Sequence, residues 1–285
     1  MKRAVVLALV LALAGFGQGP RKSAPRKESK MSPQQVADLV KRNDWRVLDA
    51  PQVLTPQAGE ALLPLVGDPN PQVRELAVNA LSLTGGPAAK QGFYRALRDR
   101  IETVRAAAMN HLEKTYQAED LPNLAREFTT NDHEYVRERI AIILGQSGGP
   151  GAAPYLQAQL AKEPDPDARH AISIALARLG DPGQQQAWMA RFNDQNPQSR
   201  VKAIEDLKYI QDRRLLPYIA PAFDDTRIAK NVGPSHGPWY IRICDLAVLV
   251  LQAVLGQPLP FPVAETTRYD AQQLAMAKTI VAQIR

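Results

Sequence analysis

Three residues near the C-terminal end of the chain, His236, Cys244 and Asp245, are of the types that form a base, a nucleophile and an orienting acid in cysteine enzymes. Such a set would support a lyase or hydrolase activity. No nucleophile-elbow or oxyanion motif accompanies them, and a lone free cysteine is usually a small buried apolar residue. We keep the enzyme as the alternative hypothesis and expect Asp245 to pin a neighbouring insert to its helix, with Arg242 or the insert as its partner.

The other histidines do not form a set that could bind a metal. His111, His133 and His170 fall in different segments, and none has a histidine or cysteine at metal-ligand spacing. The sequence also predicts no strands, so no glycine-rich phosphate loop follows a strand. We therefore predict no metal site and no bound cofactor.

Six arginines recur through most of the chain, and each of these six is followed seven residues later by leucine. The five intervals between them are 31, 32, 32, 31 and 42 residues. The six arginines are Arg74, Arg105, Arg137, Arg169, Arg200 and Arg242. Six residues before each stands a polar, mostly acidic residue, namely Asp68, Asp99, Asn131, Glu163, Asp194 and His236. We interpret the six arginines as a structural ladder of hydrogen bonds between the turns of adjacent repeats; a ligand surface is the alternative.

Each period contains the pattern of two helices. In the first, Thr55 caps a helix that carries an apolar face, Asn70 caps a second helix that opens with a proline, and a Gly-Gly-Pro sequence ends it. Asp165 and Asn196 begin later helices in the same way. The pattern predicts an all-α fold: a right-handed α-α superhelix of about six helix pairs with a capping helix at each end.

The first repeat resembles the consensus of HEAT repeats. The resemblance rests on the run from Asp68 to Arg74 and on four residues of the helix and turn that follow, Ala77, Ala80, Leu81 and Gly85. The short period is similar to that of many bacterial HEAT-like proteins, among them bilin lyases, and it extends over residues 55–256. The last module, which includes Arg242, Cys244, Asp245 and Gly256, resembles the end of some exported HEAT-repeat proteins. The resemblance implies a solenoid and says little about function.

The N-terminal residues have a different character. Lys2 and Arg3 precede an apolar run closed by small residues, which predicts a signal peptide over residues 1–19 and an exported protein, periplasmic or extracellular. Residues 20–31 form a basic linker, expected to be disordered, that suits weak contact with an anionic envelope surface or lipid. The signal peptide and the linker together carry the whole formal net charge of +6, so the remaining residues have no net charge. A neutral array disfavours nucleic acid as a partner.

The remaining boundaries follow from the repeat. Residues 32–54 are expected to form an N-terminal cap, and residues 257–285 a proline-rich strap and a capping helix from Arg268 to Arg285. The long interval before Arg242 predicts an inserted loop at residues 224–238. Insertions in repeat proteins often lie on the binding face, although this one could equally cap the stack. The candidate partner-binding residues in and beside it are Arg227, Lys230, His236, Trp239 and Tyr240.

From these observations the leading hypothesis is an exported, non-catalytic scaffold. We expect it to bind a protein partner or an envelope polymer through the concave face of the second helices of each pair and through the inserted loop.

Overall fold

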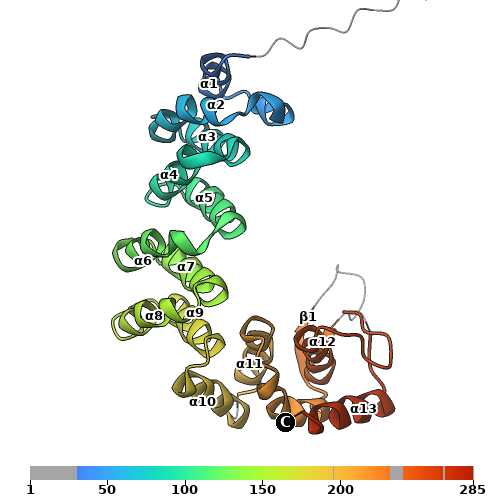
Figure 1. The fold of residues 1–285 in the computed structure, drawn as a ribbon. Helices are drawn as coiled ribbons and strands as arrows, with labels where there is room; N and C mark the ends of the chain where they lie inside the picture. The colour runs from blue at the N-terminus through green and yellow to red at the C-terminus, as the bar shows by residue number, and fades with distance from the viewer. Residues whose placement is uncertain (1–30, 195, 232–239, 266, 285) are drawn as a thin grey trace, which may run out of the picture.

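The computed structural model describes residues 31–194, 196–231, 240–265 and 267–284. These residues form helix pairs stacked side by side in one curved array, which confirms the predicted all-α solenoid (Figure 1). The first helix of each pair lies on the outer side of the curve and the second on the inner side. We call them A helices and B helices.

The capping residues start the helices where the sequence predicts. The side chain of Thr55 accepts a hydrogen bond at the start of α2 (Pro56–Leu62), and that of Asn70 does so at the start of α3 (Pro71–Thr84). Asp165 and Asn196 cap α9 (Pro166–Arg178) and α11 (Pro197–Ile210) in the same way, each before a proline in the first turn. A proline costs nothing at that position because its missing N–H would have no partner within the helix.

Five α-helical A helices and six B helices follow in the described residues. The A helices are α2, α4 (Gly86–Ala96), α6 (Leu121–Thr130), α8 (Ala153–Leu160) and α10 (Pro182–Ala190). The B helices are α3, α5 (Glu102–Thr115), α7 (Glu134–Ser147), α9 (Pro166–Arg178), α11 (Pro197–Ile210) and α12 (Ile243–Leu255). Helix α1 (Pro33–Lys41) precedes the array and α13 (Ala271–Ala282) ends it.

Short 3-10 helices complete the pairs. They are η1 (Trp45–Asp49), η2 (Pro51–Val53), η3 (Leu63–Gly67), η4 (Ala118–Asp120), η5 (Pro150–Ala152), η6 (Arg191–Asn193) and η7 (Arg213–Asp224). The long segment η7 takes the place of the last A helix, and it contains Pro217 and Pro221. Each proline removes a backbone donor and clashes with the α-helical turn before it, which accounts for the different winding of this segment.

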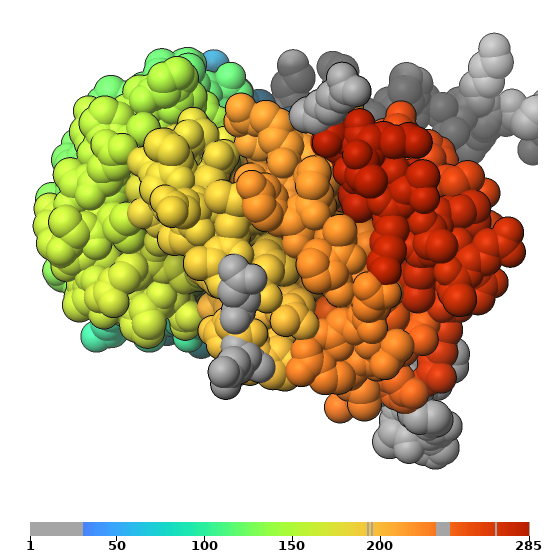
Figure 2. All heavy atoms as spheres, turned by 90° about the horizontal axis from the view of Figure 1, so that it is seen from below, coloured from blue at the N-terminus to red at the C-terminus, as the bar shows by residue number. Residues whose placement is uncertain are grey.

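The buried apolar side chains form two clusters. One extends from Val36 to Leu176 and the other from Ile174 to Val281. Half-buried Ile142 and Tyr209 pack against both clusters and so join them. Figure 2, which views the molecule from below, shows the orange elements packed against the yellow helices of the preceding pairs, and the red C-terminal elements packed against the orange ones. The two clusters therefore belong to one continuous array.

The structure corrects two expectations at the C-terminal end. Two short antiparallel strands are present, β1 (Ile228–Asn231) and β2 (Tyr240–Arg242), whereas the sequence predicted none. The last helix begins at Ala271, capped by Asp270, and not at Arg268, because the backbone of Tyr269 is held by hydrogen bonds to side chains of other segments. Both differences arise from long-range pairing that the local pattern does not contain.

Within the described ranges, no helix combines the length and the apolar character that crossing a bilayer requires. The predicted signal peptide and most of the basic linker lie outside these ranges.

Candidate interaction surface

The ladder arginines lie at the start of the B helices, where each faces the turn of its own repeat. Four of them donate to the backbone carbonyl six residues earlier. The pairs are Arg74 with Asp68 (2.9 Å), Arg105 with Asp99 (2.8 Å), Arg137 with Asn131 (2.9 Å) and Arg169 with Glu163 (3.0 Å from Nε). A carbonyl that would otherwise lack a partner at the end of a turn thus gains a charged donor.

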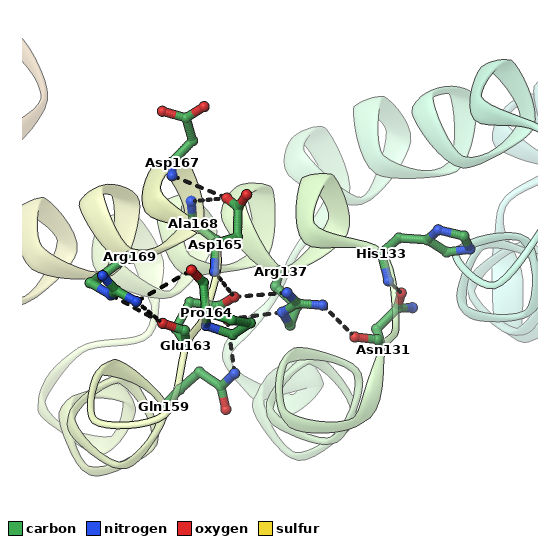
Figure 3. Close-up of polar contacts among 10 residues, drawn as sticks. All are labelled: Asn131, His133, Arg137, Gln159, Glu163, Pro164, Asp165, Asp167, Ala168 and Arg169. Carbon is green, nitrogen blue, oxygen red and sulfur yellow. Dashed lines mark hydrogen bonds and ion pairs between the residues drawn. The ribbon is translucent and has the colours of Figure 1, made fainter.

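Some of these arginines also reach the next repeat. Arg74 makes a bidentate ion pair with Asp99, with Nε to Oδ2 at 2.5 Å and Nη2 to Oδ1 at 2.8 Å. Arg137 binds Glu163 in the same way, at 2.9 and 2.7 Å, and the side chain of Glu163 is fully buried (Figure 3). These contacts join successive turns, as in the hydrogen-bond ladder proposed from the sequence.

The ladder is not regular, however. In the turn after Arg105 the corresponding residue is Asn131, which has no charge, and the Nε of Arg105 has no hydrogen-bond partner among the described residues. Asp194, in the turn after Arg169, instead accepts from the backbone of Asn196 and so stabilises its own turn. Among the described residues, the arginine-to-acid pair between turns therefore forms at some layers, such as Arg74 and Arg137, and is replaced at Arg105 and Arg169 by hydrogen bonds to backbone carbonyls alone.

Burial and hydrogen bonding oppose each other at the paired acids. Burial is the largest single influence on Asp99 and Glu163 and favours their neutral form, but hydrogen bonds from the paired arginines and from neighbouring donors, together with the arginine charges, outweigh it and hold the pKa of each carboxyl below its usual value. Both acids are therefore charged at neutral pH, and each arginine has a full ionic partner.

At the inserted segment the acid in the ladder is Asp225 and not His236. Asp225 Oδ2 accepts from Arg200 Nη1 at 2.6 Å and from Arg227 Nη2 at 2.6 Å. The insert lies after this acid, so counting back from Arg242 reached the wrong residue. The side chain of Arg227 holds the pKa of Asp225 low, at about 2, by hydrogen bonding.

The two strands form the base of the insert. Asn231 pairs with Tyr240 and Ile228 with Arg242, so the chain leaves and returns at neighbouring points. Exposed Lys230 contacts Glu205 of the B helix α11, with Nζ and Oε1 3.3 Å apart. The insert therefore emerges beside the B helices. His236 and Trp239 lie outside the described residues.

Tyr240 is half-buried, and the Arg268 guanidinium lies over its ring at 4.2 Å from the centroid. The stacking brings the end of β2 against the C-terminal strap. Of the five candidate partner-binding residues, the structure thus places Arg227 and Lys230 on the surface, both in ion pairs, and Tyr240 beneath an arginine.

Asp245 connects the last ladder arginine to the strap. Its Oδ2 accepts from Arg242 Nε at 2.8 Å, and its Oδ1 accepts from Arg242 Nη2 at 2.7 Å and from the backbone N–H of Tyr269 at 3.1 Å. Arg242 in turn donates to the Tyr269 carbonyl at 2.9 Å. The carboxylate that looked misplaced on an apolar position holds the end of β2 and the strap before α13 together.

Cys244 is fully buried beside it. Burial raises the pKa of the thiol, and the nearby charge of Asp245 raises it further. A thiol in this environment is a poor nucleophile, because the reactive thiolate is disfavoured.

The structure also contains a cluster of three polar side chains that the sequence did not predict. On the B helices α9 and α11, His170 Nε2 lies 2.9 Å from Asp206 Oδ1, and Arg191 contacts both residues. The three are far apart in sequence and share no motif, so only the stacking of successive pairs brings them together. They join α9, η6 and α11.

The fold and the arginine ladder define an α-helical solenoid of short repeats. The sequence matches the family described as HEAT repeats over residues 37–113, 59–139 and 121–187, more than half of the chain. The chain belongs to the HEAT-repeat family. The match ends before the broken period and the insert.

Comparison with other proteins adds little about activity. Curated proteins give no significant sequence match. Among solved structures, a chain from the complex of CpcE and CpcF of phycocyanin lyase from Nostoc sp. PCC7120 is 16% identical, with a TM-score of 0.46. The alignment covers 95% of this chain and all of that one. The likeness is too distant to indicate an activity.

Proposed function

We propose that this HEAT-repeat protein is an exported, non-catalytic scaffold that binds a protein partner along the B-helix face and the insert beside it. The proposal rests on the continuity of one surface. The B helices line the inner side of the curve (Figure 1), and the base of the insert is joined to the B helix α11 through the contact of Lys230 with Glu205. A curved array of this kind presents one long surface to another macromolecule.

The chemistry of this surface supports a protein as the partner. Exposed side chains of both charges lie along the B helices, such as Glu205 and Lys202 on α11, and Ile228 at the start of β1 is 50% exposed. Mixed polar residues with an apolar anchor are typical of a protein interface, whereas a polyanion site would carry an excess of one charge.

A non-catalytic role is supported by the environment of Cys244 and Asp245. The thiol is buried with a raised pKa, and the carboxylate is occupied by Arg242 and the Tyr269 backbone. Replacing Cys244 with serine tests the enzyme alternative: full retention of cellular activity by Cys244→Ser supports the scaffold, and its loss in a variant that folds normally supports catalysis.

Export is proposed from the first 19 residues alone. Mass spectrometry of the protein from envelope fractions should show an N-terminus near residue 20. An intact N-terminus on a protein recovered from the cytoplasm would contradict this part of the proposal. The basic linker that would then begin the mature chain suits weak contact with anionic lipid.

Affinity capture from envelope extract tests partner binding. The bait is residues 20–285, beside a variant in which residues 232–239 are replaced by a short Gly-Ser turn; Asp225 and both strands stay because they carry the ladder contact and the base of the insert. We expect a protein partner that is lost with the insert or with Lys202→Glu. Recovery of the same proteins with every bait would overturn the proposal, and so would recovery of a nucleic acid whose binding weakens steeply with salt concentration.

A further inference from the structure

A cleft of about 890 Å³ opens on the outer side of the array, between the A helices α4 and α6. It lies on the face opposite the one proposed above. One wall carries Lys90, Tyr94 and Arg95 of α4 with Arg98 just after it, and the other carries Arg126 and the acids of η4 and α6. In Figure 1, α4 and α6 stand farther apart than α6 and α8.

The acids at the floor of the cleft are already neutralised. Lys90 Nζ donates to both oxygens of Asp120, at 2.9 and 2.7 Å, and only 6% of the Asp120 side chain is exposed. The side chain of Glu127, which is 4% exposed, forms ion pairs with Arg98 Nε at 2.9 Å and with Arg126 Nε at 3.5 Å. The negative charges therefore lie beneath the surface, each paired with a cation of the wall.

The floor holds no other negative charge. The hydroxyl of Tyr94 is covered and has no hydrogen-bond partner among the described residues. Burial raises the pKa of Tyr94, so the hydroxyl stays neutral. An anionic ligand would meet a neutral floor.

The rim of the cleft is basic. Arg95 and Arg100 are exposed, and side-chain exposure is 46% for Arg98 and 60% for Arg126. Arg95 and Arg98 also line a second hollow, together with Arg100, so the basic surface continues around the edge of α4. Gly67 leaves the space in which the Arg95 guanidinium lies, because a side chain there would collide with it. Among the exposed residues of the cleft wall, Glu119 is the acid that opposes this charge.

The geometry points to a binding site for an acidic segment of a protein partner, lying between α4 and α6. Guanidinium groups pair with carboxylates through two parallel hydrogen bonds. Arg95 and Arg100 form no ion pair among the described residues, and Arg98 and Arg126 share the single carboxylate of Glu127, so this edge keeps an excess of positive charge. A nucleic acid or polyphosphate fits less well, because its regular charge would run beyond the few arginines onto an array that has no net charge after residue 30. The site is separate from the B-helix face, so this inference does not depend on the function proposed above.

A peptide selection tests the site directly. Random peptides displayed on phage are selected on the folded protein, residues 31–285, and the enriched peptides are synthesised with a fluorescent label for titration. We expect enrichment in aspartate and glutamate, and a loss of affinity of about tenfold or more on Arg95→Glu, a substitution at an exposed side chain that should leave folding unchanged. Circular dichroism verifies that it does.

Lys162→Glu provides the control for the reversal of charge. Lys162 is exposed and lies two repeats beyond the cleft, at the position that corresponds to Arg98. Acidic peptides should bind this variant within about twofold of the unmodified protein, the range of a remote surface charge. Peptides without acidic enrichment, equal losses in both variants, or polyphosphate and single-stranded DNA binding more tightly than the acidic peptides would each overturn the inference.

Discussion

Two ladder arginines, Arg137 in the middle of the array and Arg242 at its C-terminal end, each bind a carboxylate and a backbone carbonyl, but these groups come from different segments. Arg137 bonds the carbonyl of its own turn and the buried Glu163 of the next repeat. Arg242 has no following repeat, and it takes Asp245 from its own helix and the carbonyl of Tyr269 from the strap. The comparison teaches that where a ladder arginine has an ionic partner, the carboxylate and the carbonyl can come from different segments: from the turns on either side of Arg137, and from the helix and the strap around Arg242.

Loss of these two ion pairs should destabilise regions of different extent. The pair of Arg137 and Glu163 joins neighbouring repeats inside one apolar cluster, so its loss weakens the stack on both sides. The pair of Arg242 and Asp245 joins the array to its last helix, so its loss should be felt mainly there. The following changes test this difference, beginning with the largest expected effect.

Replacing Glu163 with alanine should destabilise the protein by about 3–5 kcal/mol, because Arg137 is left as a buried charge without its partner. Urea unfolding followed by circular dichroism measures the loss. Arg46→Ala removes the arginine of an exposed ion pair, with 84% of its side chain exposed, and leaves the Asp44 side chain in place as the cap of η1; it should leave the midpoint unchanged. Similar losses in the two variants would contradict a special role for the buried pair.

Asp245→Ala should cost about 2–3 kcal/mol, since Arg242 is partly exposed and water replaces some of its contacts. Hydrogen exchange should accelerate in α13 and the strap, while the amides of α3 keep their protection. Glu265→Ala, an exposed change in the same strap, serves as the control. Faster exchange throughout the array would show that the terminal contact is not local.

Gly145→Ala should destabilise the middle of the array by about 1–3 kcal/mol. A methyl group there would lie 2.8 Å from the Cα of Ala175 in α9 and would collide with the Tyr209 hydroxyl. Helix propensity alone predicts the opposite, a gain of up to about 1 kcal/mol. Gly151→Ala meets only an ordinary contact and is the control; thermal unfolding of both variants decides between packing and propensity.

Acid should weaken the ladder at the insert. The folded-state pKa of Asp225 is about 2, below its unfolded value, so its contribution is complete above about pH 4 and is lost as the pH falls through 2. The loss should be at most about 2 kcal/mol, since Arg227 is largely exposed and its interaction is screened. Unfolding measured between pH 5 and 2 should show a smaller decline for Asp225→Asn, and an equal decline would contradict the assignment.

The sequence was sufficient to predict the helices and their stacking, because several helix starts have a local signal and the repeat period indicates the others. Thr55 and Asn70 are capping residues followed by proline, and the period of the arginines marks the repeat. That Asp245 needs a partner, with Arg242 as one candidate, could also be inferred, since a carboxylate on an otherwise apolar face must be paired; its hydrogen bond to the Tyr269 backbone of the strap could not.

The acid that binds Arg200 could not be assigned from the sequence. The prediction placed each turn residue six positions before the next ladder arginine, and the insert, which begins after Asp225, changes that spacing before Arg242. The two strands were missed because a short hairpin depends on pairing between Ile228 and Arg242, and neither segment alternates clearly enough to predict a strand. The cleft was missed because Lys90 and Asp120 come from different repeats, and nothing in their local sequence shows that α4 and α6 stand apart.

Site-specific photo-crosslinking tests the central claim, that a protein partner is held on the B-helix face. A photoreactive phenylalanine is introduced in the producing cells at Asn110 and Lys202, exposed on B helices, and at Ala158 and Ala187, exposed on A helices. We predict crosslinks to one protein from both B-helix positions and none to that protein from the A-helix positions. Crosslinks to it from the A helices alone, or none from the B helices, would contradict the account.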